Sequence, residues 1–108
     1  MTRTAPEPTD RALRAIGHQL RPIVTIGDRG LTDAVAEAAD EALARHELIK
    51  VKLPAGAKAE RTGTAEALAA RCAARCVQLI GRTALLFRAA PDAGATSNLQ
   101  RHAHLVGR

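Results

Sequence analysis

The sequence predicts an α/β fold, an α+β sandwich whose elements follow the order α-β-α-β-α-β-β around a four-stranded mixed sheet. Segments with helical spacing of apolar residues alternate with short strand-like runs along most of the chain. Helices that connect the first three strands favour layered α/β packing. The last two strands are separated by Gly81-Arg82, a two-residue turn typical of an antiparallel hairpin. The length of 108 residues indicates one domain.

The chain is expected to begin with a flexible lead, a helix and a buried strand. Residues 1–9 contain two prolines and no apolar periodicity, and a helix is expected to begin near Arg11. Its apolar face is formed by Leu13, Ile16 and Leu20. Pro22 ends this helix, and the run at residues 23–26 is β-branched throughout, which is typical of a buried strand.

The second helix is acidic, and the strand after it is basic on one side. Thr32 is a good N-cap for a helix over residues 33–47, a segment that contains five carboxylates. In the strand at residues 48–53, the apolar side is formed by Ile49, Val51 and Leu53. Lys50 and Lys52 share the opposite side, because successive side chains of a strand point to opposite faces.

The third helix is expected after a turn-rich connection at residues 54–63, with Thr64 as its cap and both Cys72 and Cys76 inside it. Two strands follow at residues 77–80 and 83–88. The pattern stops near residue 89. We therefore predict a domain over residues 10–90 and a disordered tail over residues 91–108.

Charge and aromatic content restrict the kind of partner. The chain has 16 Lys and Arg against 11 Asp and Glu, a net charge of +5, which favours a polyanion: nucleic acid first, an anionic membrane second. Phe87 is the one residue among Phe, Tyr and Trp, so a stacking platform for bases cannot be built. No stretch is long enough to span a membrane, and no signal peptide is visible. We expect a soluble, cytoplasmic monomer that does not act at a membrane.

Neither a metal site nor an active site is indicated. Two cysteines are too few for a disulfide framework, and the histidines lack metal-like spacing. Weak metal binding by His102 and His104 is a minor alternative. The sequence contains no phosphate-binding P-loop, nucleophile elbow or paired-carboxylate signature on a recognisable scaffold. We therefore expect no cofactor and no enzymatic activity.

Three motifs in order resemble the CRM domain family. They are the GxxG-Leu-Thr loop at residues 27–32, the segment HELIKVK at residues 46–52, and the closing hairpin at residues 77–88. The resemblance covers about residues 10–90, and a chain with one such domain is similar to the bacterial YhbY type. It implies a sheet like that of the C-terminal domain of translation initiation factor three. It also implies binding of RNA, specifically ribosomal RNA of the pre-large (pre-50S) subunit during ribosome assembly.

The candidate RNA-binding residues gather on a loop and on basic side chains. The loop consists of Gly27, Asp28, Arg29 and Gly30, where glycines let a backbone approach a phosphate and the next helix presents its N-terminus. A plain strand-to-helix turn is the alternative. The other candidates are Arg11, Arg14, Arg21, Lys50, Lys52 and Arg82. We expect the first helix to lie close to the loop; Lys50 and Lys52 could instead only keep a face soluble.

Two features qualify this interpretation. Asp28 places a carboxylate where relatives often have small, polar or basic residues, and Asp28 could instead turn away to cap the following helix. The acidic second helix is predicted to face away from RNA, because it would repel phosphates. It supports the first alternative function, a protein-interaction module. The second alternative is a KH-like single-strand RNA reader, which would require the GxxG loop to lie between two helices.

Overall fold

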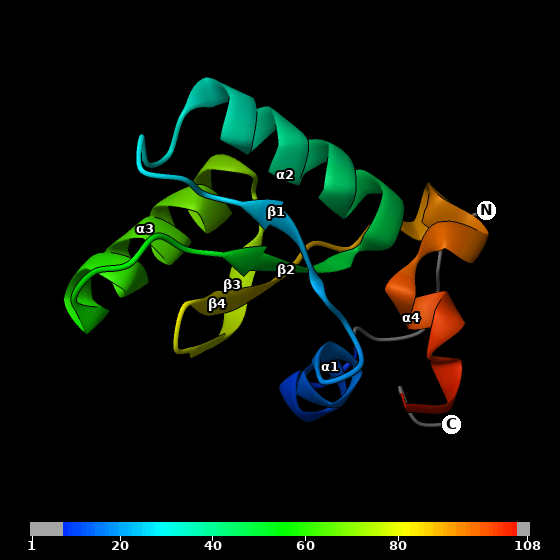
Figure 1. The fold of residues 1–108 in the computed structure, drawn as a ribbon. Coiled ribbons are helices and arrows are strands. Elements are labelled where there is room, and N and C mark those ends of the chain that lie inside the picture. The colour runs from blue at the N-terminus through cyan, green and yellow to red at the C-terminus, as the bar shows by residue number, and fades with distance from the viewer. Residues whose placement is uncertain (1–7, 106–108) are drawn as a thin grey trace.

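The computed structural model describes residues 8–105 and has the predicted fold class. Seven elements form the domain core, in the predicted order (Figure 1). They are α1 (Asp10–Gly17), β1 (Pro22–Thr25), α2 (Asp33–His46), β2 (Leu48–Lys52), α3 (Lys58–Arg71), β3 (Arg75–Ile80) and β4 (Thr83–Phe87). Three short helical segments follow: η1 (Pro91–Thr96), α4 (Asn98–Arg101) and η2 (Ala103–Leu105).

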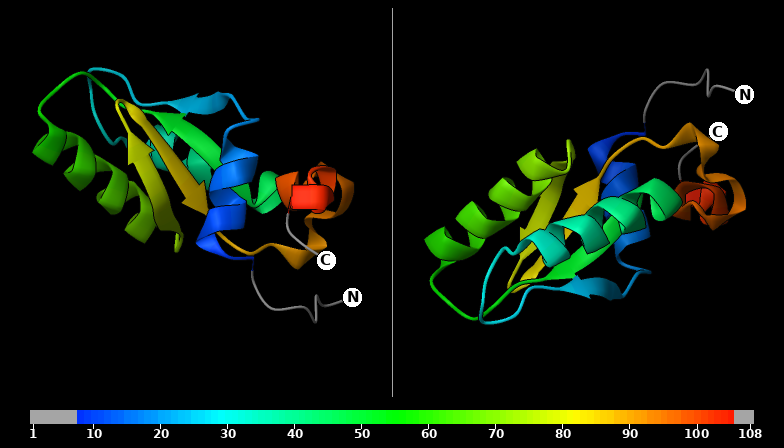
Figure 2. Two further views of the ribbon diagram at one scale, coloured as in Figure 1. Left: turned by 90° about the horizontal axis from the view of Figure 1, so that it is seen from below. Right: turned by 90° about the horizontal axis from the view of Figure 1, so that it is seen from above.

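The four strands form one mixed sheet in the order β1-β2-β4-β3. β1 and β2 are parallel, whereas β4 is antiparallel to both β2 and β3. Helices α2 and α3 cover one face of the sheet, and α1 lies against the other (Figure 2). Each face has its own apolar core, because the strands bury side chains on both sides.

The α1 face of the sheet is covered only in part. Leu13 and Ile16 of α1 pack on Leu48 and Phe87, at the start of β2 and the end of β4. Beyond this contact, five side chains along the strand pairings form what we call the open face: Lys50 and Lys52 of β2, Thr83 of β4, and Gln78 and Ile80 of β3. Ile80 is 59% exposed. The predicted division of β2 into an apolar side and a basic side is confirmed.

Helix α3 begins six residues earlier than its predicted cap at Thr64, at Lys58. The N-cap position of α3 is Ala57, which has no polar side chain to cap the helix. The Glu60 side chain instead stabilises this end, because its Oε1 accepts a hydrogen bond from the Ala57 backbone N–H at 2.9 Å. The Thr64 hydroxyl instead donates to the Glu60 carbonyl inside the helix. The helix also ends earlier than predicted, so Cys76 lies in β3 and not in α3.

Residues 91–105 differ from the predicted disordered tail, because they fold back onto the domain. The Asn98 amide Nδ2 donates to the Leu48 carbonyl at 2.6 Å, and the Ser97 hydroxyl donates to Glu47 Oε1 at 2.7 Å. Leu99 is 5% exposed and joins the core under α1. These contacts satisfy buried polar groups and bury apolar surface, which together hold the segment.

Of the predicted flexible lead at residues 1–9, Pro8 is buried and the Thr9 hydroxyl caps α1 by accepting from the Ala12 N–H, so this end of the lead is fixed. Residues 1–7 and the end of the predicted tail, residues 106–108, lie outside the described residues.

Candidate nucleic-acid interface

The glycine-flanked loop between β1 and α2 forms an accessible turn. Gly30 N–H donates to the Gly27 carbonyl at 2.9 Å, and Gly30 has a φ of 76°, a left-handed conformation that favours glycine. Gly27, Asp28 and Arg29 are exposed. The turn is therefore open to a ligand. The loop follows a strand, so the arrangement that the KH-like alternative requires is not present.

Carboxylates lie on both sides of this loop. The Thr32 hydroxyl accepts from the Val35 N–H at 3.2 Å, so Thr32 caps α2 and Asp28 does not. Asp28 instead lines a hollow together with Glu60 and Arg61 of α3. The first turn of α2 carries Asp33, which forms an ion pair with Arg71. The positive end of the α2 dipole thus already faces a carboxylate, which reduces its attraction for a phosphate.

Three basic side chains lie at the loop end of the sheet. Ile26 N–H, one residue before the loop, donates to the Lys52 carbonyl at 2.8 Å, which places Lys52 beside the loop. The hairpin turn reaches the same end, because Arg82 Nε donates to the Leu53 carbonyl at 3.0 Å. Arg29, Lys52 and Arg82 are all exposed. The structure therefore brings these three predicted residues to one end of the molecule.

The first helix does not join them. We predicted that Arg11 and Arg14 would lie close to the glycine-flanked loop, and this placement is wrong: α1 and the loop lie at opposite ends of β1 (Figures 1 and 2). The physical reason is the apolar face of α1, which packs on Leu48 and Phe87 and so fixes the helix far from the loop. Arg11 is exposed and Arg14 half-buried on this helix.

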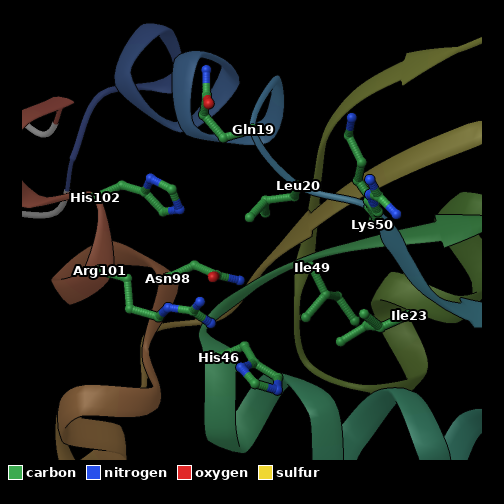
Figure 3. Close-up of a pocket in the computed structure, with 10 residues that line it drawn as sticks. Gln19, Leu20, Ile23, His46, Ile49, Lys50, Asn98, Arg101 and His102 are labelled. Atoms are coloured by element: carbon green, nitrogen blue, oxygen red, sulfur yellow. The ribbon is translucent and has the colours of Figure 1, made fainter.

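A second group of basic side chains surrounds a cleft at the α1 end of β1 and β2. The cleft has a volume of about 300 Å³, and we call it the cationic cleft (Figure 3). It is lined by the basic residues Arg21, Lys50 and Arg101 and by His46 and His102. Its other lining residues are Gln19, Leu20, Ile23, Ile49 and Asn98. Among the residues that the structure describes, none that lines the cleft carries a carboxylate. Arg21 and Lys50 were predicted, whereas Arg101 and His102 were missed because their segment was expected to be disordered.

Lys50 also lines a second hollow, on the open face. This hollow, again about 300 Å³, is bounded by the end of α1 and by strands β1, β3 and β4. Its lining residues are Gly17, His18, Pro22, Lys50, Gln78, Ile80, Thr83 and Leu85. Lys52 follows Lys50 on the same side of β2. The open face therefore joins the cationic cleft at one end to the loop at the other.

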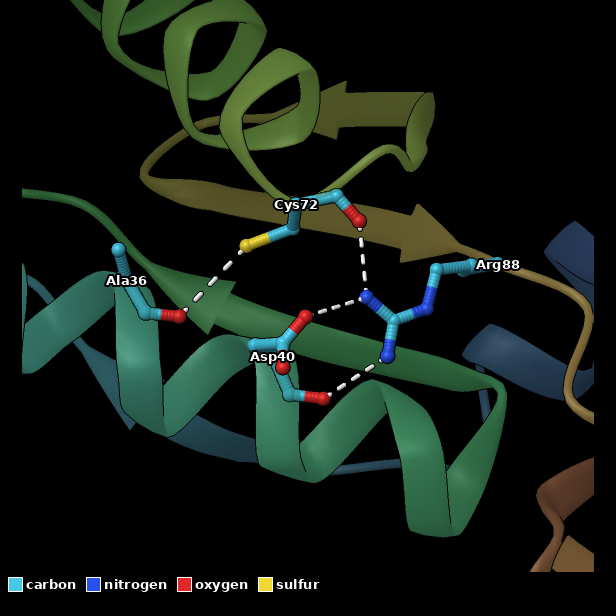
Figure 4. A network of polar contacts seen from close by, with 4 residues as sticks. All are labelled: Ala36, Asp40, Cys72 and Arg88. Carbon is cyan, nitrogen blue, oxygen red and sulfur yellow. Dashed lines mark hydrogen bonds and ion pairs between the residues drawn. The ribbon is translucent and has the colours of Figure 1, made fainter.

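Three other arginines are held by carboxylates. Arg88 pairs with Asp40 at 2.6 Å, and its guanidinium also donates to the Cys72 carbonyl at 2.8 Å (Figure 4). Arg75 pairs with Asp10 at 2.5 Å, and its guanidinium carbon lies 5.5 Å from the centre of the Phe87 ring. Arg71 pairs with Asp33. The sequence left the placement of these arginines open; in the structure they connect elements of the fold.

The acidic side of the molecule lies away from Lys50 and Lys52. Helix α2 packs on the opposite face of the sheet from the open face, as predicted (Figure 2). Glu37 and Glu41 of α2 line a hollow of about 510 Å³ that opens beside Ile23 and His46. Basic and acidic surfaces are thus separated by the sheet and by β1 at its edge.

The described residues show no metal centre and no membrane segment. Within residues 8–105, no group of three or more His, Cys, Asp or Glu side chains is arranged to hold a metal ion. No helix in this part of the chain has the length and apolar character needed to cross a bilayer. The pKa of the Cys72 thiol is raised by burial and, secondarily, by Asp40. The pKa of Cys76 is raised by burial and then by Glu66. Both thiols therefore stay protonated and unreactive near neutral pH.

Relatives of this chain are found in several bacteria. A protein of Pseudomonas aeruginosa, named as a probable RNA-binding protein, is 36% identical over 94 residues, which cover 86% of this chain and 90% of that protein. A Haemophilus influenzae protein named as RNA-binding is 35% identical over 81 residues, covering 75% of this chain and 82% of the relative.

The fold is similar to a solved structure. The solution structure of a Staphylococcus aureus protein proposed to bind RNA matches with a TM-score of 0.69 and 30% identity, over 75% of this chain and 84% of that one. A family model described as the CRS1/YhbY (CRM) domain matches residues 7–88, which include α1 to β4 and the glycine-flanked loop. With this match over most of the chain, and with relatives aligned along most of their length, the protein belongs to the CRS1/YhbY (CRM) domain family.

Proposed function

We propose that this protein binds RNA, and that its target is ribosomal RNA in the precursor of the large (50S) subunit, whose assembly it assists. It acts as a cytoplasmic monomer and as a binding protein, not an enzyme. The observation that carries the proposal is a series of basic side chains along one side of a CRM domain: Arg21 and Lys50 at one end, then Lys52, then Arg29 and Arg82 at the other.

Binding is directed at the sugar-phosphate backbone. The one aromatic side chain, Phe87, is 2% exposed and cannot stack on a base. Lysines and arginines at several points along the open face instead suit a chain of phosphates, and the glycine-flanked loop lets a backbone come close. Recognition then depends on the 2′-hydroxyl groups and on the shape of the RNA more than on its base sequence.

The distribution of ion pairs supports RNA over a protein partner. The alternative function uses the acidic side of α2, but Asp33 and Asp40 already pair with Arg71 and Arg88 inside the molecule. Glu37 and Glu41 are exposed, which a solvated helix face explains. By contrast, Lys50 and Lys52 lie on a face that α1 leaves partly uncovered, and this face has no role in packing α2 or α3.

Sedimentation of cell extracts through a gradient tests the proposal. Under gentle salt, the protein should migrate with precursors of the large subunit, and a Lys50→Ala/Lys52→Ala double variant should shift toward the fractions of free protein. Arg71→Gln is the control for charge lost elsewhere, because it removes a positive charge from α3, on the opposite face of the sheet; each single variant, Lys50→Ala and Lys52→Ala, is compared with it charge for charge. Migration of the unaltered protein as free protein throughout would contradict a ribosomal target. Charge reversal of Glu37 and Glu41, which the protein-interaction alternative predicts to be disruptive, should leave the migration unchanged.

A further inference from the structure

We infer that the segment at residues 97–105 completes a phosphate-binding site, in which Arg101 contacts the RNA backbone beside the phosphates that Arg21 and Lys50 attract. The inference rests on the proposed RNA binding and adds a contact outside the family match, which ends at residue 88. The site is the cationic cleft, and its ligand is a phosphodiester.

The segment is anchored at defined points. Both carboxylate oxygens of Glu47 are occupied: Oε1 accepts from the Ser97 hydroxyl and Oε2 from the Ala90 N–H, each at 2.7 Å. Glu47 itself is 2% exposed. The Asn98 amide is buried against the Leu48 carbonyl, and Leu99 fills the core beneath α1. Arg101 is therefore carried by a segment fixed to the start of β2, and not by a free tail.

Cationic residues from three separate parts of the chain line the cleft. Arg21 comes from the connection between α1 and β1, Lys50 from β2 and Arg101 from α4. Figure 3 shows Arg101 and His102 on one side of Leu20 and Lys50 on the other. Arg21 and Arg101 are exposed and Lys50 is half-buried. None of the described lining residues is acidic, so three positive charges at residues 8–105 face the cleft without a lining carboxylate, and an anion is the ligand they favour.

The surroundings define the direction in which an RNA strand would run. On the α2 side, the neighbouring hollow contains Glu37 and Glu41, which repel phosphate. On the other side, Lys50 is shared with the hollow on the open face, and Lys52 lies farther along β2. A strand with one phosphate in the cleft would continue over the open face toward the glycine-flanked loop. The C-terminal segment thus extends the proposed RNA surface at its α1 end.

The test compares Arg101→Gln with the unaltered protein and with Arg71→Gln, a charge-matched control on the opposite face of the sheet. Affinity for a fluorescently labelled single-stranded oligoribonucleotide, and for the same RNA as a duplex, is measured over a series of salt concentrations. We expect Arg101→Gln to bind about three- to tenfold more weakly. The slope of log affinity against log salt should fall by about 0.7, the share of one phosphate contact. Arg71→Gln should keep the slope of the unaltered protein.

A second variant tests the role of docking. Leu99→Ala keeps every charge but loosens the segment that carries Arg101. The slope of log affinity against log salt should therefore fall by most of the amount expected for Arg101→Gln. Urea unfolding and circular dichroism check that its core is intact.

The outcomes separate the two proposals. If the unaltered protein binds RNA and Arg101→Gln keeps its affinity and slope, the cleft is not a backbone site, while the proposed function stands. If the unaltered protein binds neither RNA, the proposed function itself is wrong. Competition with adenosine monophosphate distinguishes the source of the phosphate: displacement of the RNA at micromolar nucleotide would show a nucleotide site and overturn the assignment to RNA backbone.

Discussion

The guanidinium of Arg88 forms two hydrogen bonds with Asp40: Nη1 donates to the Asp40 carboxylate Oδ1 at 2.6 Å, and Nη2 donates to the Asp40 backbone carbonyl at 3.0 Å (Figure 4). Nη1 also donates to the Cys72 carbonyl at the end of α3. Arg88 follows β4 directly, so one side chain connects the sheet to both helices that cover it. The Arg88 side chain is 22% exposed, which makes it the most enclosed member of the ion pairs described above.

Arg88→Ala should lower the free energy of unfolding by about 1–2 kcal/mol, because charge-assisted hydrogen bonds to two helices are lost together. Urea denaturation measures the change. Arg71→Ala is the control: Arg71 and Asp33 are 44% and 85% exposed, so breaking this pair should cost less than about 1 kcal/mol. Equal effects of the two substitutions would show that Arg88 does not act as a structural connector.

The docked C-terminal segment should contribute to stability. Leu99→Ala removes a side chain that is 5% exposed among Leu13, Ile16 and Phe87, and should cost about 2 kcal/mol in urea unfolding. Gln100→Ala, at the exposed neighbouring position, should change little. Amide hydrogen exchange offers a second measurement, because a packed segment protects the Arg101 and His102 amides that bond to Ser97 and Asn98. Rapid exchange at both amides would restore the original prediction of a disordered tail.

Arg29 is the basic side chain of the glycine-flanked loop, and its contribution can be read from salt dependence. If Arg29 meets a phosphate, Arg29→Ala should lower the slope of log affinity against log salt by about 0.7. Arg11 lies on α1 at the opposite end of β1, so Arg11→Ala at the same net charge separates a local contact from a general charge effect. Identical slopes for the two variants would remove Arg29 from the interface.

Asp28 should weaken the RNA affinity of this loop. Its carboxylate is exposed and does not cap α2, a role taken by Thr32. Asp28→Asn keeps the size of the side chain and removes the repulsion between carboxylate and phosphate, so RNA affinity should rise by about two- to fivefold at low salt. The gain should disappear at high salt, because dissolved ions then screen the repulsion between the carboxylate and the phosphate. A loss of affinity would mean that the carboxylate itself contacts the RNA.

The buried thiol of Cys72 should make stability depend on alkaline pH. Burial raises its pKa in the folded state above the ordinary value of 9.0, so the folded protein holds this proton more tightly than the unfolded chain. The stability contribution is complete below pH 9.0 and is lost as pH rises from there through the folded-state pKa. Unfolding in urea across this range should show the decline, and Cys72→Ala should flatten it. A decline of the same steepness in Cys72→Ala would assign it to other groups.

The sequence by itself determined the order of the elements and the two sides of β2. Helical and alternating spacings are local signals, so α1, α2 and the strands lie close to where those spacings predict them. The same alternation placed Lys50 and Lys52 opposite Ile49 and Val51, as the strand pairings confirm. The prediction that acidic α2 lies away from these lysines came from charge alone, because an acidic helix would repel phosphate, and the structure places α2 on the other face of the sheet.

The tertiary structure alone decided where the basic side chains meet. The distance from Arg11 to the glycine-flanked loop depends on where α1 packs, and the burial of Leu99 depends on the apolar cluster that α1, β2 and β4 form together. The polar composition of residues 91–105 predicted disorder, although the segment is docked on the domain. Its polar side chains Ser97 and Asn98 form hydrogen bonds with Glu47 and Leu48, about fifty positions earlier in the sequence. Contacts between residues so far apart leave no periodic trace in a sequence, because their partners are brought together only by the completed sheet.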